Sequence, residues 1–92
     1  MKTVLLIEDD KSLRENTTEI LQLSNYNVLA AENGKTGVKI ALQNLPDIIV
    51  CDIMMPKWDG YKVFNLLNQK ETTRRIPFIF MSAKSEEKDI RT

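Results

Sequence analysis

The stretch Val4-Leu5-Leu6-Ile7-Glu8-Asp9-Asp10 joins four apolar residues directly to three carboxylates. A short unbroken apolar run is typical of a strand that is covered on both faces in a parallel sheet. Carboxylates about 4 Å apart repel by about 4 kcal/mol at the effective dielectric of a protein surface, so such a cluster needs solvent screening or a bound cation. The stretch therefore predicts a strand and, at its end, a charged site.

The alternation of strand and helix continues along the chain. Three further apolar runs predict strands, at residues 28–31, 48–51 and 77–81. Apolar residues at helical spacing predict helices between them, at residues 12–24, 34–45 and around 63–67. In the first helix, one face is predicted to contain Leu13, Thr17, Ile20, Leu21 and Ser24. Ser85 is expected to begin another helix. This order predicts an α/β fold with an open parallel sheet and right-handed crossovers.

The composition fits one small domain and removes several classes of chemistry. The chain has 92 residues, 13 basic and 13 acidic side chains, no histidine and one cysteine. It lacks the basic excess that signals direct nucleic-acid binding, and no apolar run reaches the length of a membrane span or signal-peptide core, so a cytoplasmic location is expected. Without histidine, Ser-His-Asp and Cys-His catalysis are excluded. Cys51, inside an apolar run, is interpreted as a buried core residue.

Polar side chains follow three of the predicted strands. They are Glu8, Asp9 and Asp10 after the first strand, Asp52 after the third and Ser82 after the fourth. Open parallel sheets bind ligands at the carboxyl ends of their strands, so these side chains are expected to meet at one edge. Carboxylate oxygens suit Mg²⁺. Asp10 is interpreted differently, as a helix cap or surface acid, because carboxylates favour helix N-termini.

Two classes of phosphate-binding protein fit the sequence poorly. Gly34-Lys35-Thr36 resembles the end of a nucleotide-binding P-loop, but that loop needs a glycine where Leu29 stands. Aspartyl-phosphate phosphatases of the haloacid-dehalogenase type need a second aspartate where Met54 stands. Trp58 is interpreted as a partly exposed loop aromatic, because no second aromatic or basic cluster accompanies it as a nucleotide-stacking platform requires.

Three segments together resemble the receiver domains of two-component response regulators. They are VLLIEDD at residues 4–10, DIIVCDIMMPKWDG at 47–60 and IPFIFMSAKS at 76–85. The resemblance implies a three-layer, flavodoxin-like receiver fold with strand order 2-1-3-4. It also implies a role in phosphorelay signalling, in which a sensor histidine kinase or phosphotransfer protein phosphorylates the domain and an output domain or downstream protein responds.

The same resemblance implies roles for individual residues. Asp52 would be the phosphoacceptor. Mg²⁺, for which Mn²⁺ can substitute, would be bound by Glu8 (mostly through water), Asp9, Asp52 and the backbone carbonyl of Met54. Ser82 would donate a hydrogen bond to the phosphoryl group, and Ala83 would leave space for it. The domain would be a phosphoacceptor rather than an enzyme, with at most slow self-catalysed phosphorylation and dephosphorylation.

The sequence departs from the family pattern at its C-terminal end. Receivers continue through a fifth strand followed by a Lys-Pro pair, and Lys84 lies too soon after the fourth strand to replace that lysine. Residues 1–92 are therefore interpreted as a receiver domain that is incomplete at its C-terminus. The fourth strand would then be an edge with an uncharged, β-prone run, Phe78–Met81, through which self-association is expected. A degenerate receiver that acts as an unphosphorylated interaction module stays the alternative.

Overall fold

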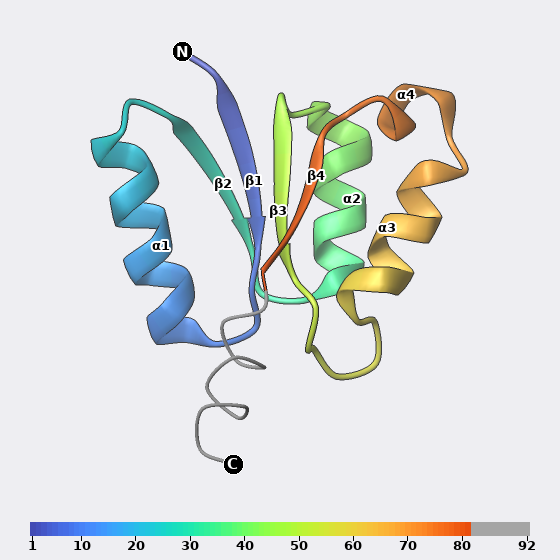
Figure 1. Ribbon diagram of the computed structural model, residues 1–92, viewed down its shortest axis with the longest axis horizontal. Coiled ribbons are helices and arrows are strands. Elements are labelled where there is room, and N and C mark those ends of the chain that lie inside the picture. The colour runs from blue at the N-terminus through green and yellow to red at the C-terminus, as the bar shows by residue number, and fades with distance from the viewer. Residues whose placement is uncertain (82–92) are drawn as a thin grey trace.

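The computed structural model describes residues 1–81 as a parallel sheet flanked by helices (Figure 1). In chain order the elements are β1 (Thr3–Ile7), α1 (Lys11–Leu23), β2 (Asn27–Ala31), α2 (Gly34–Asn44), β3 (Ile48–Asp52), α3 (Gly60–Asn68), α4 (Glu71–Arg74) and β4 (Phe78–Met81). The four strands are parallel in the order β2-β1-β3-β4, which confirms the predicted order. Helix α1 covers one face of the sheet, and α2 and α3 cover the other.

The predicted elements are present with small differences at their ends, but the short helix α4 was not predicted. Its four residues are too few to show an apolar period. The side chain of Thr73 is buried, and its hydroxyl donates a 2.6 Å hydrogen bond to the carbonyl of Leu67 at the end of α3. A contact across the turn therefore stabilises α4. The helix predicted to begin at Ser85 lies outside the described residues.

The main hydrophobic core lies between the sheet and the helices α2 and α3. Its strand residues are Leu5, Ile7, Ala31, Ile49 and Cys51, and its helix and loop residues are Ala41, Met55, Val63 and Leu67. Burial of a large aliphatic side chain contributes about 1.5–3 kcal/mol, so this layer supplies most of the apolar stabilisation. It also holds the neighbouring strands β1 and β3 in register, with Ile7 opposite Cys51.

The opposite face of the sheet is less covered by the described residues. Helix α1 packs over β1 and β2 and contains no buried residue. Ile20, on the face predicted to be shared with Leu13, Thr17, Leu21 and Ser24, is 63% exposed. The helical period was correct, but among residues 1–81 α1 is the only helix on this face, and its far side has no described neighbour (Figure 1).

Strand β4 pairs with β3 on one side, and no other described strand pairs with it. Phe78 and Phe80 lie toward α3, where they form an aromatic cluster with Tyr61 and Phe64 at centroid separations of 5.0–5.7 Å. Ile79 lies on the other face and is 48% exposed. The strand is thus anchored through its phenylalanines and presents an apolar residue on the less covered face.

Candidate functional site

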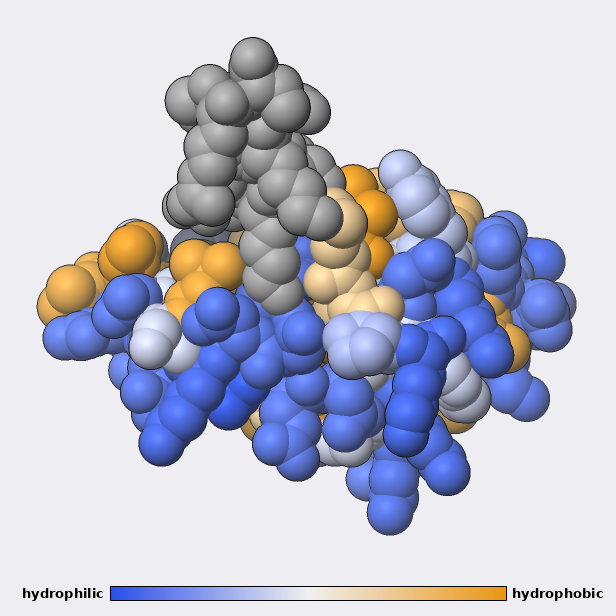
Figure 2. All heavy atoms as spheres, turned by 90° about the horizontal axis from the view of Figure 1, so that it is seen from below, coloured by the Kyte–Doolittle hydropathy of each residue, from blue (hydrophilic) through white to orange (hydrophobic). Residues whose placement is uncertain are grey.

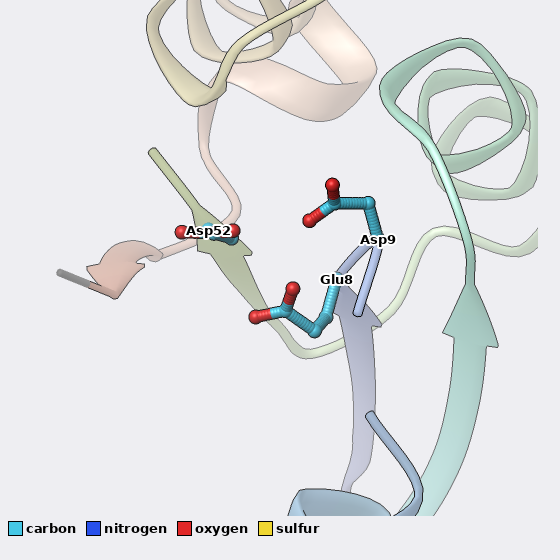
Figure 3. A group of neighbouring side chains, drawn as sticks. All are labelled: Glu8, Asp9 and Asp52. Carbon is cyan, nitrogen blue, oxygen red and sulfur yellow. The ribbon is translucent and has the colours of Figure 1, made fainter. Parts of the chain in front are cut away.

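Three acidic side chains meet at the carboxyl ends of β1 and β3 (Figure 3). Because Ile7 pairs with Cys51, Glu8, directly after β1, and Asp52, the last residue of β3, lie at adjacent strand ends. One carboxylate oxygen from each of Glu8, Asp9 and Asp52 lies within 4.8 Å of the other two. Figure 3 shows Glu8 and Asp9 on one side of the cluster and Asp52 on the other. This convergence was predicted from the strand-end positions.

Two of these three carboxylates are deeply buried. Glu8 and Asp52 are each 1% exposed, whereas Asp9 is partly exposed. The backbone N–H of Asp10 donates to Glu8 Oε2 at 2.9 Å, and the N–H of Met54 donates to Asp52 Oδ1 at 3.2 Å. Burial of a carboxylate is costly even with such hydrogen bonds, so converging carboxylates favour a cation at their centre.

The donor set fits a magnesium ion. Mg²⁺ binds oxygen at about 2.0–2.1 Å in octahedral geometry, so opposite ligands around one ion lie about 4.2 Å apart. The 4.8 Å limit on the carboxylate separations is close to this span. Small side-chain adjustments or retained water would complete the coordination. Carboxylate oxygens are hard ligands, which suit Mg²⁺ or Mn²⁺ better than soft metals.

The structure separates Asp10 from the metal-site candidates, as predicted. Its side chain accepts a 3.0 Å hydrogen bond from the N–H of Leu13 and caps the N-terminus of α1. Met54 lies in the loop directly after β3, bonded through its N–H to Asp52. Ser82 and Ala83 lie outside the described residues, so their roles stay predictions. The face with the strand ends is largely hydrophilic, with smaller hydrophobic patches (Figure 2).

One residue at this site was missed in the sequence. The guanidinium of Arg14 donates from Nη1 to the carbonyl oxygens of Glu8 at 2.9 Å and Asp9 at 3.4 Å. A signal was present, because helical side chains tilt toward the N-terminus of their helix, and a long side chain in the second turn of α1 reaches the preceding loop. Helical periodicity assigned Arg14 only to a polar face.

The loop after β3 folds back tightly onto the backbone of Asp52. The N–H of Gly60 donates to the carbonyl of Ile53 at 2.9 Å, and Asp59 caps α3 by accepting from the N–H of Lys62 at 2.9 Å. A Cβ atom on Gly60 would lie 2.7 Å from the carbonyl oxygen of Asp52 and 2.9 Å from Ile53 Cα. These are backbone atoms of the site itself, so only glycine fits here without displacing them.

We expect Gly60→Ala to destabilise the fold by about 1–3 kcal/mol, the usual cost of forcing an added group into a packed site. Urea unfolding measures the change. Asn65→Ala is the matched control, because Asn65 is exposed on the same helix and alanine there only raises the helix propensity, by up to about 0.7 kcal/mol. Equal losses of stability in the two variants would contradict the backbone clash.

Cys51 is buried in the core, as predicted, and lies beside the acid cluster. Burial, and then the charges of Asp52, Glu8 and Asp59, raise the pKa of the Cys51 thiol from 9.0 to about 12. At pH 8 about one thiol in ten thousand is then ionised. The Cys51 thiol is therefore expected to be unreactive, although it is adjacent to Asp52 in the acid cluster.

We expect Cys51 to react with disulfide reagents only as fast as the protein unfolds, because the thiolate is the nucleophile. Labelling in buffer and in denaturant measures the contrast. The raised pKa favours folding below pH 9, and this contribution is lost as the pH rises from 9 toward 12. The free energy of unfolding should thus fall more steeply over that range in the wild type than in Cys51→Ala. Rapid labelling of the native protein would contradict the burial.

The sheet order and the strand-end acids define an open α/β domain with a candidate metal site. The response regulator receiver domain family model matches residues 4–92, and the chain belongs to this family. The chain is 34% identical to protein PilH of Pseudomonas aeruginosa over an alignment of 89 residues. This alignment covers 97% of this chain and 74% of PilH. The chain is also 37% identical to histidine kinase P4 of Formosa agariphila over an alignment of 83 residues. This alignment covers 90% of this chain and 6% of that kinase.

The solved structures agree. The receiver domain of sensor histidine kinase PA1611 of Pseudomonas aeruginosa, described with a magnesium ion coordinated in its active site cleft, superposes with a TM-score of 0.86 at 26% identity, over 99% of this chain and 75% of that domain. The chain spans 36–39% of the length of several transcriptional regulators that it matches. Among residues 1–81, no helix combines the length and apolar character needed to cross a membrane.

Proposed function

We propose that this chain is a phosphoacceptor of a two-component signalling system and is phosphorylated on Asp52 with Mg²⁺ as cofactor. The observation that supports this most strongly is the convergence of Glu8, Asp9 and Asp52 within 4.8 Å at adjacent strand ends. Phosphoryl transfer depends mainly on positioning and on neutralisation of spread negative charge. A divalent cation bound by these carboxylates would supply that neutralisation.

In the proposed reaction, an oxygen of Asp52 attacks the phosphorus of a phosphohistidine on a sensor kinase or phosphotransfer protein. The phosphorus–nitrogen bond breaks, its electron pair stays on the imidazole nitrogen, and a new phosphorus–oxygen bond makes an acyl phosphate. The Met54 N–H, 3.2 Å from Asp52 Oδ1, helps to orient the carboxylate. Ser82 would donate to a phosphoryl oxygen, and Ala83 would leave room for it. Any self-catalysed phosphorylation or dephosphorylation would be slow.

The partner that reads the phosphorylated state is left open by the comparisons. Matched relatives include a histidine kinase and transcriptional regulators, in which the chain corresponds to only part of the protein. The receiver could therefore serve an output domain or a separate downstream protein. We assign it no direct contact with nucleic acid, because its basic and acidic residues are balanced at 13 each.

The proposal is tested by incubating the protein with acetyl phosphate and Mg²⁺. We expect the mass to increase by one phosphoryl group, only when the divalent cation is present. An acyl phosphate is cleaved by hydroxylamine, whereas a phosphoserine is not, so hydroxylamine should remove the label. A folded protein that binds Mg²⁺ and gains no label would instead support a degenerate receiver that acts as an unphosphorylated interaction module.

We also expect the 92-residue chain to self-associate through β4. Among residues 1–81 no strand pairs with the outer side of β4. An uncharged strand edge favours pairing with another chain, and Ile79 adds an exposed apolar side chain beside that edge. Light scattering across a concentration series should show association that Ile79→Lys weakens. Leu42→Lys is the control, since Leu42 is 37% exposed on α2, across the sheet. A monodisperse wild-type chain at high concentration would contradict this expectation.

A further inference from the structure

Arg14 contacts the backbone of the acidic loop at three consecutive residues. Its Nη1 donates to the carbonyl oxygens of Glu8 and Asp9, at 2.9 and 3.4 Å, and its own backbone N–H donates to the carbonyl of Asp10 at 2.8 Å. The side chain is half-buried against the loop. Arg14 thus binds the segment between the end of β1 and the start of α1 from the helix side.

Two further hydrogen bonds of the described residues anchor the ends of this loop. At the sheet end, the N–H of Glu8 donates to the carbonyl of Ala31 in β2 at 3.0 Å. At the helix end, Asp10 caps α1 through Leu13. The peptide units of Glu8 and Asp9 lie between these anchors, and their orientation determines where both carboxylates point. The planar guanidinium carries donors in fixed directions, so it restrains these units more firmly than a flexible ammonium group would.

We propose that Arg14 is a positioning residue for the acid site: by holding the carbonyls of Glu8 and Asp9, it directs both carboxylates toward Asp52 and so increases the affinity for a divalent cation. The cation part of this inference rests on the proposed function. Arg14 acts through the loop backbone and is not placed among the ligands.

The direction in which cation affinity changes when Arg14 is replaced separates positioning from simple charge repulsion. A positive charge near a cation site opposes cation binding, so its removal alone should tighten binding. Loss of positioning should weaken binding instead. Outer-shell partners of metal ligands typically contribute 10- to 100-fold to metal affinity, so the positioning effect is expected to exceed the charge effect.

Arg14→Met and Arg14→Lys are compared with the wild type by titration with Mn²⁺, followed by electron paramagnetic resonance. We expect the dissociation constant to rise about tenfold in both variants. The lysine variant keeps the charge and should not restore affinity. Lys11→Met is the matched control, because Lys11 is an exposed cation in the first turn of the same helix. Its removal should leave Mn²⁺ affinity unchanged or slightly tighter.

Amide hydrogen exchange without metal provides a second readout. The Asp10 N–H donates to Glu8 Oε2, so it should exchange faster in both Arg14 variants, while the amide of Leu6 within β1 stays protected. Unchanged exchange at Asp10, or Mn²⁺ affinity that is unchanged or tighter in Arg14→Met, would overturn the inference. A folded wild type that binds no divalent cation would overturn the proposed function, and exchange at Asp10 would still decide whether Arg14 holds the loop.

Discussion

Asp52→Asn is expected to abolish phosphorylation by acetyl phosphate, with a loss of at least about a thousandfold because the bond-forming group is removed. The amide is a poor nucleophile, and it also removes one of the three negative charges that converge within 4.8 Å. The measurement is intact-protein mass after incubation with donor and Mg²⁺. Asparagine keeps the shape of the side chain and its Oδ1 acceptor for the Met54 N–H, so the fold should persist.

The matched control for this variant is Asp59→Asn. Asp59 lies in the same loop after β3, where it is exposed and accepts from the N–H of Lys62 at the start of α3. It should be labelled like the wild type, because asparagine is also a good N-cap. Thermal unfolding of both variants confirms that they are folded. Label that survives Asp52→Asn, or that resists hydroxylamine, would contradict the assignment of the phosphoacceptor.

Asp9→Ala is expected to weaken Mg²⁺ binding by at least about tenfold, since a full charge about 4 Å from a cation contributes up to about 4 kcal/mol at a protein surface. A wild-type dissociation constant near millimolar, about 4 kcal/mol, is expected of a site with few carboxylates and retained water. Fluorescence of Trp58 can follow the titration. This residue packs against the core in the loop after β3, with Lys62 Nζ 4.7 Å from its ring centroid.

Asp10→Ala provides the comparison for Asp9→Ala because the two carboxylates are adjacent in sequence and serve different partners. Asp10 caps α1 and stands outside the cluster. Its removal should lower the free energy of unfolding by about 1 kcal/mol, the usual loss for an N-cap, with little change in Mg²⁺ affinity. Asp9→Ala should show the reverse pattern. Equal effects of the two substitutions on Mg²⁺ affinity would reject this division of roles.

Local signals in the sequence were enough to predict most elements and the members of the acid cluster. Strand β1 and the acids after it are readable because a buried parallel strand needs an unbroken apolar run, and ligands bind where such strands end. The cap at Asp10 was also predictable, since capping involves residues only three positions apart. The strand order came from the family resemblance, and the structure confirms it.

Tertiary structure decided what depends on partners distant in sequence or on side-chain direction. The 4.8 Å convergence of Asp52 with Glu8 and Asp9 requires β1 and β3 to pair in one register. Helix α4 is stabilised by the hydrogen bond from the hydroxyl of Thr73 to the carbonyl of Leu67. The exposure of Ile20 depends on which elements cover α1. Periodicity records which face a residue occupies, but it does not record what lies opposite that face. For the same reason the sequence showed Arg14 as a polar helix residue, and only the folded loop showed the two carbonyls that it binds.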